Sequence, residues 1–148
     1  KALVYLDAFI PQHGDCLNGL LVKALPPEVW PMFVNGFRDA ARAEHCGLTQ
    51  AMPAAVFNIR EDNRAWVDRR CRAQALATFE APVLLNGDIA KVKHRRYILA
   101  DGWDPSPFRY FAAQCEKDPA WKVTKLPCSH DVMVDMPQEL AAELLTLT

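Results

Sequence analysis

Short apolar runs alternate with helical patterns along this chain. Ala2 to Ile10 is apolar, β-branched and aromatic, and it stops at Pro11, which is typical of a short buried strand. Residues 97–100 and 121–126 form two further strand-like runs. Between them, Ser106-Pro107 is typical of a helix start, with serine as the N-cap. The apolar face of that helix is predicted from residues at i, i+3, i+4 and i+7, namely Phe108, Phe111, Ala112 and Cys115.

Residues 11–82 have a different character. Prolines punctuate helical pieces there, which we place at about 28–45, 62–72 and 73–79. The first piece has an apolar face made of Trp30, Phe33, Val34 and Phe37. The sequence therefore predicts an irregular helical insertion.

A last helix is predicted near the end of the printed sequence. Asp135-Met-Pro-Gln138 is similar to a capping box, with Asp135 as the cap. The buried stripe of this helix is expected at Leu140, Ala141, Leu144 and Leu145. The order of strands and helices predicts an α/β fold in which a three-stranded parallel sheet has flanking helices. Residues 1–10 and 83–148 would form this core, and 11–82 the insertion.

Composition and charge narrow the class of protein. The 148 residues are 51% hydrophobic and 24% charged, which is ordinary for one globular domain and excludes disorder or a disulfide miniprotein. A formal net charge of −1 gives no footprint for nucleic acid, and no apolar run is long enough to span a membrane. The basic runs 69–72 and 91–96 are interpreted as solvated faces. The cysteines are expected to be reduced and mostly buried, which favours a cytoplasmic location; they are Cys16, Cys46, Cys71, Cys115 and Cys128.

Chemistry is expected where the strands end. Asp7 follows the first strand, Asp101 and Asp104 follow the second, and His130 follows the third. In open α/β sheets the ligand site lies at the carboxyl ends of the strands, where a carboxylate can fix the tautomer of a histidine. Metal binding by the His13 to Cys16 segment and nucleophilic attack by Cys128 are the weaker interpretations, so no metal site is predicted.

Three segments carry a family resemblance: Leu3-Val-Tyr-Leu-Asp-Ala-Phe9, Tyr97-Ile-Leu-Ala-Asp-Gly-Trp-Asp-Pro-Ser-Pro-Phe108 and Cys128-Ser-His-Asp-Val-Met-Val-Asp-Met-Pro137. They resemble the last three strand regions of an α/β-hydrolase, in the branch of the esterases and hydroxynitrile lyases. The resemblance implies that the chain is the C-terminal half of such a protein and that residues 11–82 are its cap.

The resemblance also implies roles for individual residues. His130 matches the catalytic histidine, and Asp104 best matches the acid of a Ser-His-Asp triad, with Asp101 and Asp7 as the alternatives. A substrate pocket is expected at Phe9, Trp30, Phe33 and Trp103. The substrate would be a small carboxylic ester, and neither a cofactor nor a metal is implied.

The nucleophile of the family does not occur in this sequence. A G-x-S-x-G motif is missing, and the two serines are Ser106, interpreted as a helix cap, and Ser129, which adjoins the histidine in a loop. Because the chain opens on Lys1 and runs directly into a strand, its start resembles a cut. We therefore expect the chain alone to be inactive, and its first strand to pair with the missing N-terminal half or with a second copy. The alternative is a non-catalytic remnant that acts as a self-associating or binding module.

Overall fold

Three parallel strands form the centre of the structure. The computed structural model describes residues 2–43 and 46–147. Strand β4 (His94–Ala100) lies between β1 (Ala2–Leu6) and β5 (Trp121–Leu126), and the whole sheet has the order β1-β4-β5. Residues 97–100 are almost completely buried because both faces of the sheet are covered, as is typical of an apolar run in a parallel sheet. The predicted α/β class and parallel sheet are confirmed.

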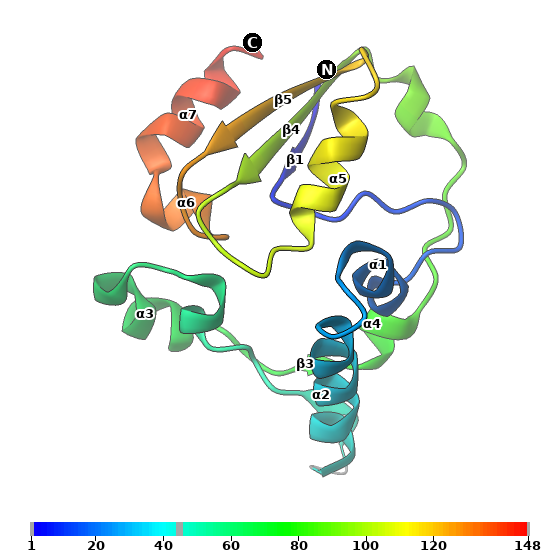
Figure 1. Cartoon of the computed structure of the whole chain (residues 1–148), viewed down its shortest axis with the longest axis vertical. Coiled ribbons are helices and arrows are strands. Elements are labelled where there is room, and N and C mark those ends of the chain that lie inside the picture. The colour runs from blue at the N-terminus through cyan, green and yellow to red at the C-terminus, as the bar shows by residue number, and fades with distance from the viewer. Residues whose placement is uncertain (1, 44–45, 148) are drawn as a thin grey trace.

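Helices cover both faces of this sheet (Figure 1). Tyr97 points toward α5 (Phe108–Cys115), where its hydroxyl donates to the Phe108 carbonyl. Its neighbour Arg96 points the other way and donates to Glu143 of α7 (Pro137–Leu145). Successive strand residues face opposite sides, so α5 and α7 lie on opposite faces. All four residues predicted for the apolar face of α5 are buried.

The last helix differs from its prediction. Asp135 is the last residue of a separate short helix, α6 (Val132–Asp135), and Met136 occupies the N-cap position of α7. Of the predicted stripe only Leu140 is buried, whereas residues 141, 144 and 145 are exposed. The expected cap and most of the expected stripe are therefore wrong.

The segment of residues 14–83, between β1 and β4, lies on the side of the sheet where the strands end, while the residues after it run back to the side where β4 begins (Figure 1). Its two ends meet in a stem, where Val83 accepts a hydrogen bond from Gly14 and donates one to Asp15. Its elements in chain order are α1 (Leu17–Ala24), α2 (Trp30–Ala43), β2 (Leu48–Thr49), η1 (Ala54–Phe57), α3 (Glu61–Asp68), β3 (Gln74–Ala75) and α4 (Ala77–Glu80), and η2 (Asp88–Lys91) follows the stem.

Several boundaries in this segment differ from the prediction. The predicted helix 28–45 is α2, and its expected end at residues 44–45 lies outside the described residues. The piece at 62–72 is α3 and ends four residues earlier, while 73–79 divides between β3 and α4. Helix α1 was not predicted, although the spacing of Leu17, Leu20 and Leu21 is helical and the Cys16 thiol caps its first turn.

Two expectations about burial are also corrected. Cys46 and Cys71 are exposed, whereas Cys115 and Cys128 are buried, and all five cysteines are free. Arg96, in a run interpreted as solvated, is 5% exposed because it pairs with Glu143. Among the described residues, none of the helices has the length and apolar character needed to cross a bilayer.

Candidate active site

Asp7 and His130 meet at the carboxyl edge of the sheet. Nδ1 of His130 lies 2.8 Å from Oδ2 of Asp7. Strand β1 ends at Leu6 rather than at Ile10 because Asp7 has a φ of 40°, a left-handed conformation that few residues other than glycine adopt. This turn directs the Asp7 side chain across the edge of the sheet, while its backbone N–H still donates to the Ile98 carbonyl.

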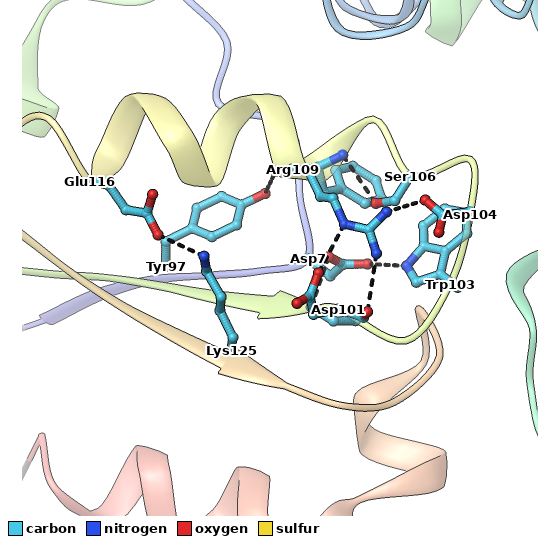
Figure 2. A network of polar contacts seen from close by, with 11 residues as sticks. Asp7, Tyr97, Asp101, Trp103, Asp104, Ser106, Arg109, Glu116 and Lys125 are labelled. Carbon is cyan, nitrogen blue, oxygen red and sulfur yellow. Dashed lines mark hydrogen bonds and ion pairs between the residues drawn. The ribbon is translucent and has the colours of Figure 1, made fainter.

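The Asp7 carboxylate is completely shielded from solvent. The backbone N–H of Ala100 donates to Oδ1 at 3.0 Å, and Nε1 of Trp103 donates to Oδ2 at 3.0 Å. Figure 2 shows the indole of Trp103 directed at Asp7. A buried carboxylate is costly unless it is hydrogen-bonded, and with His130 these groups give Asp7 three partners.

Aromatic rings surround the imidazole of His130. The Phe108 ring stacks on it with a centroid separation of 5.1 Å and an interplanar angle of 12°. Phe57 lies 5.1 Å away and Trp103 5.3 Å away, both tilted. Since Nδ1 is engaged by Asp7, Nε2 is the nitrogen that remains for proton transfer.

Asp104 and Asp101 contact Arg109 instead of His130. Arg109 donates from Nη1 to Asp104, and from Nε to Asp101 at 2.8 Å (Figure 2). These hydrogen bonds raise the pKa of the Arg109 guanidinium, with Asp101 as the largest contributor. The expected contact between Asp104 and His130 is therefore not formed. The first turn of α5 brings Arg109 to Asp104, and the carboxylate that contacts His130 is Asp7.

A cavity of about 360 Å³ opens beside His130. Three of the four expected pocket residues line it, namely Phe9, Phe33 and Trp103. Trp30 does not, since it packs on the small cluster of Leu21, Leu25 and Val34. The rest of the lining is largely apolar: Leu17, Leu21, Leu25, Phe37, Met52, Phe57, Gln74, Phe79, Pro105, Pro107 and Phe108.

Neither serine is placed as a nucleophile for His130. The Ser106 hydroxyl accepts a hydrogen bond from the Phe108 N–H at the start of α5. Ser129 is buried at 3% exposure, and its Oγ has no partner among the described residues. Burial also raises the pKa of the nearby Cys128 thiol to about 11, which keeps it protonated at neutral pH. The same effect raises the pKa of Asp131, although His130 acts in the opposite direction.

The weak metal interpretation gains no support from the geometry. Asp15 accepts from Lys23 and from the Gln12 N–H, which lowers the pKa of its carboxyl, and His13 contacts Leu85. Within residues 2–43 and 46–147, no three His, Cys, Asp or Glu side chains are grouped as metal ligands would be.

A curated esterase is closely similar to this chain. The carbendazim hydrolyzing esterase of Nocardioides sp. (strain SG-4G) is 61% identical over 147 residues. The match covers 99% of this chain and 61% of the relative, so the chain spans about three fifths of the length of the curated protein it matches. No family model and no solved structure matches the chain. The similarity supports the expectation of a hydrolase of the esterase class.

Proposed function

We propose that this chain supplies the acid and the histidine of a Ser-His-Asp triad that hydrolyses a small, apolar carboxylic ester. The contact between Asp7 and His130 beside an aromatic cavity carries the proposal. In it, Asp7 replaces Asp104 as the acid, because a triad acid must hold the histidine by its Nδ1. Residues 1–10 and 83–148 would be the C-terminal part of an α/β-hydrolase core, and 11–82 its cap.

The nucleophilic serine would come from sequence that corresponds to the part of the relative not covered here. Its oxygen attacks the ester carbonyl while Nε2 of His130 takes the hydroxyl proton. The bond to the leaving alkoxide then breaks, and His130 returns the proton to it. Water attacks the acyl-enzyme, again losing its proton to Nε2, and serine departs with that proton as the acid is released. Asp7 stabilises the imidazolium in both halves of the reaction.

The cavity restricts the substrate. Its rings and aliphatic chains favour a neutral ester with an apolar or aromatic group, while Gln74 and His130 supply polar atoms. Carbendazim, on which the relative acts by its name, is therefore the first compound to test, beside a chromogenic short-chain ester.

A chimera tests the proposal. In the Nocardioides esterase, the 147 matching residues are replaced by those of this chain, and the esterase itself supplies the part that the match does not cover. We expect the chimera to hydrolyse the esters, His130→Ala to abolish turnover, and a serine-directed phosphonate to inactivate it. Activity that survives His130→Ala would refute the proposal. The chain alone is expected to be inactive.

The open edge of β1 is the candidate site for pairing with another chain segment. Among the described residues β1 pairs with β4 on one side, and its other edge has no strand partner. We propose that this edge pairs with the rest of the parent protein or with a second copy of the chain. Native mass spectrometry followed by denaturing release of the chains distinguishes these occupants. Copies of the 16.6 kDa chain alone, with no ester turnover, would favour the non-catalytic binding module.

A further inference from the structure

The turn at Phe57 and Asn58 joins the segment at the strand ends to both loops of the candidate site. The Phe57 carbonyl accepts a hydrogen bond from the His130 N–H at 3.2 Å. Nδ2 of Asn58 donates to the Gly102 carbonyl at 2.8 Å. One loop therefore carries His130, and the other carries Trp103, the donor to Asp7.

Asn58 has a conformation that suits this contact. Its φ is 56° and its ψ is 28°, the left-handed region that asparagine tolerates better than most residues, and its N–H closes the η1 turn onto Ala55. The side chain can therefore leave the turn toward Gly102 without a change of backbone. Asn58 performs two tasks, since it ends the turn and donates to the loop.

The turn is anchored and can act as a fixed support. Ala54 and Ile59, on either side of it, are completely buried and form a cluster with Val67, and Val134 of α6 packs on this cluster. The Ala54 N–H also donates to Asp68 at 2.8 Å. Because α6 follows His130 directly, the same cluster holds the histidine loop from its far side.

The two loops also contact each other tightly. Gly102 N–H donates to the Cys128 carbonyl at 2.9 Å, and a Cβ at Gly102 would lie 2.6 Å from that oxygen. A displacement of the Gly102 loop is therefore transmitted to the segment that precedes His130, and it moves Trp103 relative to Asp7 as well.

We infer that Asn58 is a positioning residue, which holds the 101–107 loop so that Trp103, Asp7 and His130 keep their mutual geometry. This inference rests on the proposed function and deepens it: the inserted segment does more than enclose the substrate, since it also fixes the histidine. Loss of one hydrogen bond in this chain of contacts is expected to lower kcat about three- to tenfold, with KM nearly unchanged.

Two variants of the chimera separate positioning from folding. Asn58→Gly keeps the left-handed conformation and removes the donor, whereas Asn58→Asp keeps the shape and turns an acceptor toward the Gly102 carbonyl. We expect a three- to tenfold loss of kcat for Asn58→Gly and a larger loss for Asn58→Asp. Asn35→Asp, at an exposed position of α2, introduces the same charge and is expected to leave kcat unchanged.

A spectroscopic measurement makes the test independent of turnover. The Nδ1 proton of His130, held by Asp7, is expected to give a downfield NMR signal that Asp7→Asn removes. Asn58→Asp should broaden or shift this signal, while Asn35→Asp should not. Unchanged kcat and an unchanged signal in both Asn58 variants would overturn the inference. If the chimera itself does not hydrolyse esters, the proposed function fails while the signal still tests the positioning.

Discussion

Replacing Asp7 by asparagine is the sharpest test of the candidate site. The carboxylate accepts from three donors: the Ala100 N–H, Nε1 of Trp103 and Nδ1 of His130. An amide has one oxygen, so its NH2 group must face at least one of these donors. The backbone conformation is unaffected, because asparagine also tolerates a φ of 40°. The variant therefore changes hydrogen bonding and charge without a change of shape.

The expected magnitude has two parts. One buried donor without an acceptor costs about 1–3 kcal/mol of folding free energy. For turnover, exchanging a triad acid for its amide lowers kcat by about 10⁴, which is roughly 5 kcal/mol at about 1.36 kcal/mol per factor of ten. The loss arises because the imidazole then prefers the wrong tautomer and its protonated form has no counter-charge.

Steady-state kinetics of the chimera on a chromogenic ester measure the effect, with thermal unfolding to verify the fold. Asp104→Asn is the matched control, because this carboxylate is exposed and contacts Arg109. Its kcat is expected to stay within about threefold, since the weakened contact lies on the surface. The assignment of Asp7 is refuted if Asp7→Asn retains more than about a tenth of the activity, or if Asp104→Asn loses as much as Asp7→Asn does.

Further predictions concern the thiols and glycines. Cys71 is exposed, whereas burial raises the pKa of Cys128 to about 11, so a thiol reagent at pH 8 should label Cys71 quickly and Cys128 only after unfolding, as peptide mass spectrometry can check. An unfolded thiol ionises with a pKa of about 8.5, whereas Cys128 in the folded chain ionises with a pKa of about 11, so between these pH values the unfolded chain holds fewer protons than the native one. The free energy of unfolding should therefore fall as pH rises through this range. Denaturant titrations at both pH limits measure it, and equal values would contradict the prediction. Gly102→Ala should destabilise the fold by about 1–3 kcal/mol and reduce kcat, because its Cβ meets the Cys128 backbone. Gly36→Ala, in open space on α2, should stabilise the fold by about 0.5–1 kcal/mol. Equal melting temperatures for the two variants would contradict this prediction.

The sheet and α5 could be predicted because their patterns are local. The apolar run at 97–100 and the helical spacing of Phe108 and Cys115 each fix an element without reference to distant residues. Helix α1 carried the same kind of signal, in the spacing of Leu17 and Leu20, and it could have been found. The stripe of α7 misled because a helical period marks which residues share a face and leaves open whether that face is covered.

The pairing of His130 could not be settled from one sequence. Asp7, Asp101 and Asp104 all follow strands that end at the same edge, so the sequence allows each of them to contact His130. The outcome depends on the path of the 101–107 loop, which Asn58 contacts at Gly102 and Arg109 contacts at Asp101. These are contacts between side chains and loops far apart in sequence, and they have no local pattern. The same holds for Phe57, whose place against His130 follows from the fold of the inserted segment.

Burial of Asp7, the proposed acid, links the inserted segment to the candidate site. A carboxylate shielded from solvent is tolerated because Ala100, Trp103 and His130 all reach it. Trp103 lies next to Gly102, which accepts a hydrogen bond from Asn58, so the proposed positioning role of Asn58 would act on the Trp103 contact. On the proposed function, two parts of the segment at 11–82 are expected to be separable. Phe33 and its neighbours line the cavity, so exchanges there are expected to change the preferred substrate, whereas loss of the turn at Asn58 is expected to lower kcat.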